Sequence, residues 1–448
     1  MMNQNHFFAD LPMGLPEDIL RLKMHGDFEQ AIRHIDARLQ MDLPGPMANC
    51  LRAEREIMLR LPEEYPYTKE AALQLVQREI PGFSMQELDA LLSEGRIDWI
   101  LIKGEPRFLS SFFATLKKTD ACIALRAGIN PDPPKRELCL ERVLRQLKSG
   151  GEAVCRLRIG EEAFLPGKRA RVWLPVPAAC RQQRDIKIID SSPKIAFLAP
   201  EDAPQRTAYF EETLKENHPF TVEYEYESRA LLPRPGANGQ EGFEPKDLAE
   251  QPPHIRFTPY LCALCALLCQ GKEGPMERAR SFYDFITTRV QYAFVREYFG
   301  LTSIAESCAQ NLRGDCGVQA LLFITLCRCA GVPARWQSGL YAGPDHIGPH
   351  DWAQFYVQPF GWLPCDPSLG GGAYRAGNEP RRQLYFGGLD PYRMVANSAI
   401  YADFQPSSWG FRADPYDNQS GEVEIEGRGL RYGEYERTRR LICMEELF

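Results

Sequence analysis

The sequence predicts an α+β protein of several domains, and three patterns along the chain support this. Residues 28–39 repeat apolar side chains at helical spacing, residues 220–226 alternate apolar and polar side chains, and residues 316–366 place an apolar run ahead of two strand-like segments. With 448 residues, 44% hydrophobic and 25% charged, the composition is that of a globular chain too long for one hydrophobic core. About two to four domains are therefore expected.

Residues 1–148 are expected to form a mainly helical domain. The first helix is predicted from its apolar stripe, which consists of Phe28, Ala31, Ile32, Ile35 and Leu39. A second helix is predicted to begin at Ser84, because Ser84 and Glu87 form a capping box, with Phe83 and Leu88 placed for a hydrophobic staple.

A hairpin is predicted over Trp99–Ile102 and Gly104–Pro106, directly after the second helix. Two helices followed by a hairpin are compatible with a winged-helix layout. A DNA-binding version would need a basic recognition helix, whereas the helix after Ser84 is acidic. This domain is therefore expected to pack on the rest of the protein or to bind a protein partner.

Residues 151–232 are expected to form an antiparallel β-sandwich-like domain. Phe220–Tyr226 has the period of a half-buried strand, and Arg169–Pro175 gives a second strand. Residues 233–255 are expected to be a linker, since they open with a Pro- and Gly-rich stretch. Residues 411–448 are expected to be a C-terminal β extension, whose strand over Glu422–Glu426 could return to either the β domain or the core.

Cys316 stands directly before a long apolar run that ends at Gly331-Val332-Pro333, a helix stop signal. It is therefore expected at a helix N-terminus, where unpaired N–H groups and the helix dipole favour the thiolate. His350 opens an alternating segment, and Asp366 follows sixteen residues later. These are the types that cysteine acyl transfer needs: a nucleophile, a base, and a carboxylate that orients the base.

These motifs resemble the transglutaminase-like superfamily of cysteine acyl-transferases and peptidases. Over roughly residues 256–370 the resemblance is carried by Gly314-Asp315-Cys316, Ala330–Arg335, His350-Asp351-Trp352, and Gly361-Trp362 leading to Asp366-Pro367. It implies a papain-like, transglutaminase-like core over residues 256–410, with Cys316 as nucleophile, His350 as general base and acid, and Asp366 orienting the imidazole. The chain departs from the family at Asp351, where a small residue is common, and at Pro364-Cys365, which is expected to interrupt the strand before Asp366.

Three further residues are candidates for substrate or transition-state contacts. Gln310 is a candidate oxyanion donor beside the backbone N–H of Cys316, although a solvated loop amide is an equal alternative. His346 lies in a Gly- and Pro-rich segment, so a loop histidine or a substrate contact is favoured over a second base. Trp352 is expected either in the core or on the wall of a substrate groove.

No metal or other cofactor is expected. Cys262, Cys265 and Cys269 lie in an apolar helical stretch with no second Cys-x-x-Cys pair and no nearby His, so packing is favoured over a zinc site. The net charge of −7 and the absence of a long basic run argue against nucleic acid and membrane as partners.

The cellular location is expected to be the cytoplasm. The N-terminus lacks the pattern of a secretion signal, and eighteen consecutive apolar residues occur nowhere in the sequence. The 14 cysteines are then expected to be reduced thiols.

The expected function is hydrolysis of an amide bond in a peptide or protein-like substrate, through a thioester intermediate on Cys316. Hydrolysis is favoured because water is always available, whereas transamidation needs a site that excludes water and admits an amine. Protein-glutamine transamidation and a catalytically silent binding scaffold remain as alternatives.

Overall fold

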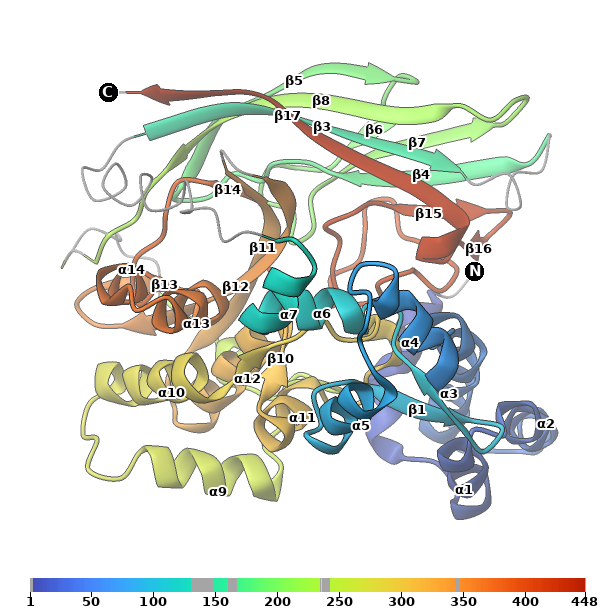
Figure 1. Ribbon diagram of the computed structural model, residues 1–448. Coiled ribbons are helices and arrows are strands. Elements are labelled where there is room, and N and C mark those ends of the chain that lie inside the picture. Colours follow the sequence, from blue (N-terminus) through green and yellow to red (C-terminus); the bar gives the residue numbers. More distant parts are fainter. Residues whose placement is uncertain are drawn as a thin grey trace.

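The computed structural model describes residues 3–129, 148–159, 167–233, 235, 242–343 and 346–447. The fold is α+β and has three layers (Figure 1): helices, a four-stranded sheet beside them, and a pair of β-sheets beyond that sheet. Most of the Pro- and Gly-rich stretch that opens the predicted linker lies outside the described residues.

The N-terminal helices pack against the helices that follow the β-sheets in the chain. They are η1 (Gln4–Met13), α1 (Glu17–His25), α2 (Phe28–Arg38) and α3 (Gly45–Glu64). The predicted stripe lies on α2, where Phe28, Ala31 and Ile35 are buried in a large cluster that also contains Phe323 of α12 (Cys316–Cys329).

A second group of N-terminal elements surrounds its own hydrophobic cluster. It consists of α4 (Lys69–Gln77), α5 (Met85–Ser93), β1 (Trp99–Ile102), β2 (Glu105–Phe108), α6 (Phe112–Thr119) and α7 (Ala121–Arg126). The capping box of Ser84 and Glu87 is present at the start of α5, and Phe83 and Leu88 are both buried. The helix predicted after Ser84 and the hairpin that follows it are present as α5 and β1–β2, but two helices that the sequence analysis did not assign, α3 and α4, lie between α2 and α5.

Two antiparallel sheets face each other across a second cluster, which contains Val172, Phe210 and Val222. One sheet has the order β16 (Arg428–Gly429), β15 (Glu422–Ile425), β4 (Arg169–Pro175), β7 (Thr207–Thr213) and β6 (Phe197–Leu198). The other has the order β17 (Tyr435–Leu447), β3 (Lys148–Ile159), β8 (Pro219–Arg229) and β5 (Gln183–Ser192). The predicted alternation is seen along β8, and the strand left unassigned, β15, pairs with β4 of the β region.

The remaining elements form the core that holds the motifs. They are η2 (Pro245–Asp247), α9 (Pro259–Leu268), α10 (Pro275–Arg289), β9 (Gln291–Tyr292), η3 (Tyr298–Gly300), α11 (Ile304–Asn311), β10 (Arg313–Gly314), α12 (Cys316–Cys329), β11 (Ala334–Ala342), β12 (Ile347–Val357), β13 (Gly361–Cys365), α13 (Pro367–Arg375), α14 (Glu379–Leu384), β14 (Arg393–Asn397) and η4 (Tyr432–Glu434).

The central sheet of this core is antiparallel, with the order β13, β12, β11, β14. Helix α12 packs on one face of it, where the rings of Phe323 and Phe355 lie 5.7 Å apart in an edge contact. Leu340 and Met394, on the other face, join the cluster of the two β-sheets. The sheet is therefore covered on both sides.

The prediction that Pro364-Cys365 interrupts the strand is wrong. Strand β13 runs without a break from Gly361 to Cys365, with Pro364 opposite Gln354 of β12. Since β13 is the edge strand of its sheet, the N–H that proline lacks is not needed for a ladder on its outer side.

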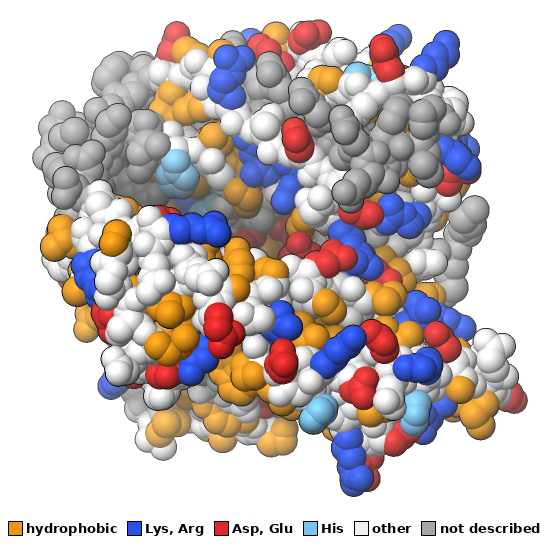
Figure 2. Space-filling model, turned by 45° about the vertical axis from the view of Figure 1, so that its right-hand side comes forward, with side chains coloured by type: hydrophobic (Ala, Val, Ile, Leu, Met, Phe, Trp, Pro, Cys, Tyr) orange, Lys and Arg blue, Asp and Glu red, His pale blue; other side chains and the backbone are white. Residues whose placement is uncertain are grey.

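Two features of the structure relate to nucleic acid and membrane as partners: the surface charge and the length of the helices. Acidic and basic side chains are interspersed on the face shown in Figure 2. Over the described ranges, no helix combines the length and apolar character needed to cross a membrane.

Candidate active site

Cys316 is the first residue of α12, as the sequence predicts, and its side chain is partly buried. Asp315 caps the helix, because its Oδ1 accepts a hydrogen bond from the Val318 N–H at 3.1 Å and one from the Tyr298 hydroxyl at 2.5 Å. Of the thirteen helix residues after Cys316, twelve are buried and the last, Cys329, is partly buried. The thiol is therefore fixed at the outer end of a buried helix.

His350 and Asp366 lie against each other in the interior. His350 Nε2 is 2.7 Å from Asp366 Oδ2, and both side chains are buried. Asp366 is also the N-cap of α13, where its Oδ1 accepts the Leu369 N–H at 2.9 Å. Arg393 Nη2 donates to the same Oδ2 at 2.9 Å and also to Asp390 at 2.9 Å. The Asp366 carboxylate is thus held from three directions.

Burial favours a neutral imidazole at His350, whereas the neighbours His350 and Arg393 favour an ionised carboxylate at Asp366. Burial lowers the pKa of His350, although the charge of Asp366 opposes this. Burial alone would raise the pKa of Asp366, but His350 and Arg393 outweigh it and hold that pKa below its usual value. A neutral imidazole is the form that can accept a proton.

The thiol of Cys316 donates its hydrogen bond to Asp351, with Sγ 3.3 Å from Oδ2. Cys316 and His350 both lie in the described part of the chain, and no hydrogen bond joins them there. Alternation along β12 explains this, because Asp351 shares the α12 face with Phe355, whereas His350 stacks on Trp352 at a ring distance of 6.0 Å. The structure therefore pairs His350 with Asp366 and Cys316 with Asp351.

A group of buried acids surrounds the thiol. Burial, followed by the carboxylates of Asp351 and Asp315, raises the pKa of Cys316. Burial also raises the pKa of Asp351, to which Asp417 and Asp315 add, and it raises the pKa of Asp315 to about 6. The helix N-terminus favours the thiolate, as expected, but these neighbours act in the opposite direction and leave a neutral thiol.

Comparison with protein families finds one matching family model, that of the transglutaminase-like superfamily, over residues 263–367. These residues form a transglutaminase-like core. The matched segment runs from within α9 to the first residue of α13, so it contains Cys316, His350 and Asp366. No curated protein matches the chain.

Solved structures similar to this chain include a candidate cysteine protease from Cytophaga hutchinsonii, with 13% identity and a TM-score of 0.37. The match covers 67% of this chain and 89% of that one. The periplasmic domain of TgpA from Pseudomonas aeruginosa is 15% identical, with a TM-score of 0.30 over 55% of this chain and 95% of that one. Both TM-scores are below 0.5, so the likeness to the transglutaminase-like superfamily rests on the family model that matches residues 263–367 and not on these structures.

Two residues beside the transglutaminase-like motifs escaped the sequence analysis. Gln419, just before β15, donates through Nε2 to the backbone oxygen of His350 at 2.9 Å and to Asp351 Oδ1. Arg393, in β14, holds Asp366 as described above. Neither belongs to a local motif, and Gln419 lies 69 residues from His350 in the sequence. Asp351, by contrast, did carry a signal, since the resemblance to the family marked it as a position where a small residue is common.

The other three candidates, Gln310, His346 and Trp352, differ in burial and in their contacts. Gln310 is exposed on α11, and within the described residues its side chain makes no hydrogen bond. His346 is exposed and stacks on Tyr341 at 4.9 Å, and Tyr341 in turn lies edge-on to His350 at 6.4 Å. Trp352 is fully buried and donates its indole N–H to Gln337 at 2.7 Å, so of the two alternatives it occupies the core.

The two cysteines of α9, Cys262 and Cys265, and its C-cap residue Cys269 are not equally buried. Cys265 is buried against α12, whereas Cys262 is exposed, with its Sγ 3.8 Å from that of Cys329. The prediction of buried packing therefore holds for Cys265 and is wrong for Cys262, because α9 is covered by α12 along one side only. Among the residues described, no three His, Cys, Asp or Glu side chains are grouped so as to hold a metal ion.

Proposed function

We propose that this protein is a cysteine-dependent hydrolase of amide bonds in peptide or protein-like substrates. In this proposal Cys316 is the nucleophile, His350 the general base and acid, and Asp366 the carboxylate that orients the imidazole. The observation that carries it is the 2.7 Å contact between His350 Nε2 and Asp366 Oδ2, in a transglutaminase-like core whose cysteine begins a buried helix.

The imidazole is positioned for proton transfer by its contact with Asp366. Because Nε2 is engaged by the carboxylate, Nδ1 is the ring nitrogen left to take the thiol proton. The thiolate then attacks the amide carbonyl, and the imidazolium returns the proton to the departing amine. Water hydrolyses the thioester with His350 again as base. The backbone N–H of Cys316 is the expected oxyanion donor.

The bond between Cys316 and Asp351 defines the resting state in this mechanism. The thiol must turn from Asp351 toward His350 before the proton can pass to the imidazole. Gln419 stabilises the resting state, because its amide donates both to Asp351 and to the backbone of His350. Reaction therefore begins with the loss of one sulfur-to-carboxyl hydrogen bond, which is a weak one.

The same bond is the observation that favours a second candidate function, the catalytically silent scaffold. A thiol held permanently by Asp351, with its pKa raised, would not attack a carbonyl. The two functions differ in whether Cys316 forms a covalent thioester.

Incubation of the protein with a peptide library tests the proposal, with and without a tagged primary amine, followed by mass spectrometry. We expect cleaved or deamidated peptides that are independent of the amine and absent with Cys316→Ala. Cys262→Ala, which removes an exposed thiol outside the site, is the matched control and should behave as wild type. Amine incorporation in excess of hydrolysis would indicate transamidation, and no product under either condition would favour the scaffold.

A further inference from the structure

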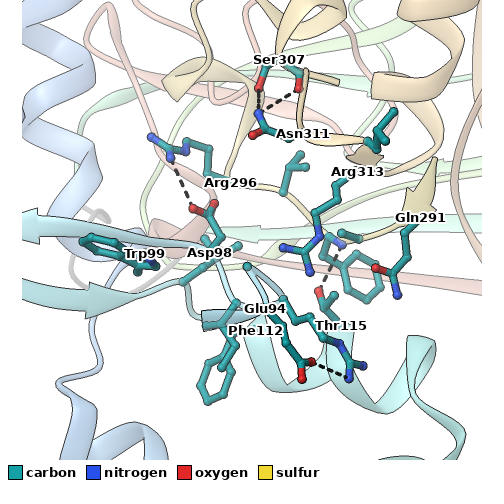
Figure 3. A pocket seen from close by; sticks show the side chains of 18 of the residues that line it. Glu94, Asp98, Trp99, Phe112, Thr115, Gln291, Arg296, Ser307, Asn311 and Arg313 are labelled. Carbon is teal, nitrogen blue, oxygen red and sulfur yellow. Dashed lines mark hydrogen bonds and ion pairs between the residues drawn. The ribbon is translucent and has the colours of Figure 1, made fainter. Parts of the chain in front are cut away.

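A cavity of about 670 Å³ lies between the N-terminal elements and the core (Figure 3). Cys316, His350 and Asp366 are not among the residues that line it. Its walls come from the end of α5, from β1 and α6 on one side, and from β9, α11 and β10 on the other. This volume is within the range of ligand sites for small organic molecules. The apolar part of the lining includes Ile97, Trp99, Phe112, Phe294 and Leu301.

The charged lining carries more positive than negative groups, in a protein whose net charge is −7. The basic residues are Arg96, Arg289, Arg296 and Arg313, and the acidic ones are Glu94 and Asp98. A surplus of cations here runs against the overall charge of the protein.

Two of these arginines already have partners. Arg96 is 2.8 Å from Asp120 and 3.8 Å from Glu94, and Arg296 is 3.7 Å from Asp98. Asp98 in turn accepts a hydrogen bond from the Tyr65 hydroxyl at 2.8 Å. Both acidic residues of the lining, Glu94 and Asp98, therefore already have partners within the protein.

Arg313 differs from them. Its side chain is partly buried, and within the described ranges its guanidinium forms no hydrogen bond or ion pair. Figure 3 shows it extending into the space between Asp98 and Gln291. Burial lowers the pKa of Arg313 and the nearby charge of Arg96 adds to this, while the charge of Asp98 opposes the shift without reversing it. A partly desolvated cation beside another cation is destabilising, and an anion bound next to it would relieve that cost.

We propose that this cavity binds a small organic carboxylate with an apolar body, its carboxylate held by Arg313 and its apolar part against Trp99, Phe112 and Phe294. The guanidinium fork matches a carboxylate with two parallel hydrogen bonds. A small inorganic anion is not the preferred ligand. It would lose hydrogen bonds to water on entering the cavity, and the aromatic walls cannot replace them.

This site does not depend on the proposed function. Gln291 and Ala293 line the cavity, whereas Tyr292 between them lies close to Cys316: burial raises the pKa of Tyr292, and the charge of Cys316 adds to this rise. The cavity and Cys316 are therefore on different sides of the β9 and β10 ladder. Ligand binding can be measured whether or not the protein is an enzyme.

Isothermal titration calorimetry with three probes tests the proposal: N-acetylphenylalanine, its neutral amide, and acetate. We expect saturable binding of N-acetylphenylalanine with a Kd of about 1 mM or tighter, and much weaker binding of the other two. Arg313→Gln should weaken binding about 10- to 100-fold, since it removes a charge-assisted hydrogen bond. Arg33→Gln, on the exposed surface of α2, is the matched control and should leave it unchanged.

A second variant tests the same site in the opposite direction. Asp98→Asn removes an acid from the lining and frees Arg296, so it should tighten binding of the carboxylate. This variant decides the question if circular dichroism shows that Arg313→Gln does not fold. The proposal is overturned if N-acetylphenylalanine does not bind saturably, if its amide binds equally well, or if neither lining variant changes the affinity.

Discussion

Replacing Asp351 with Ala is expected to activate the Cys316 thiol. Asp351 Oδ2 lies 3.3 Å from Cys316 Sγ, inside the protein. At that distance Coulomb's law, with an effective dielectric constant of about 20, gives a repulsion of about 5 kcal/mol between two full charges. This is an upper limit, because the raised pKa of Asp351 reduces the negative charge that its carboxyl carries. Even a third of that energy would lower the thiol pKa by about one unit.

The rate of alkylation by iodoacetamide, followed peptide by peptide with mass spectrometry across a pH series, measures this change. In Asp351→Ala the pH midpoint for labelling Cys316 should move down, while the labelling of exposed Cys262 serves as the internal reference. Asp351→Asn separates charge from volume, since it removes the charge and keeps the size. If Cys316 labels no faster near pH 6 in either variant than in wild type, the carboxylate is not what suppresses the thiolate, and the electrostatic reasoning fails.

Three further predictions concern His350 and the buried acids. Asp366→Asn should keep the fold, as checked by thermal unfolding, but lower kcat by up to about 10⁴-fold, by analogy with a serine triad; turnover near wild type would remove Asp366 from the catalytic set. The acid limb of kcat/KM should lie below pH 6.5, because burial lowers the pKa of His350 from that ordinary value; a limb above it would contradict the assignment of His350 as base. Burial raises the pKa of Asp417 from 3.8 to about 7, so the folded state holds this proton more tightly than the unfolded state, and the stability it contributes is lost as pH rises from about 4 to 7. Thermal unfolding of Asp417→Asn should therefore show a weaker fall in Tm over that pH range than wild type, and an unchanged slope would refute this.

Elements with a local signal could be predicted from the sequence. The start of α5 is fixed by the hydrogen bonds of Ser84 and Glu87, and the span of β8 by alternation against a single buried face. The neighbour of β15 could not be predicted, because the pairing joins Glu424 to Arg171, 253 residues away. A strand pattern specifies which side chains are buried, but not which strand lies beside it.

The same limit applies to the site. The motifs predicted where Cys316, His350 and Asp366 lie along the chain, and the structure brings the last two together. They did not predict that Cys316 would donate to Asp351, because that depends on which face of β12 the helix covers. Gln419 was beyond prediction for a related reason, since a returning segment is placed by tertiary packing rather than by its own sequence.

The pairing of β15 with β4 and of β17 with β3 has a consequence for how the chain is made. Both β4 and β3 leave the ribosome long before their partners do, since the whole core is synthesised in between. Until residues 422–447 emerge, each presents an open strand edge, which is a template for pairing with another nascent chain. A premature stop after the core would leave those edges exposed permanently, so we expect shortened chains to accumulate as aggregates rather than as a smaller working protein.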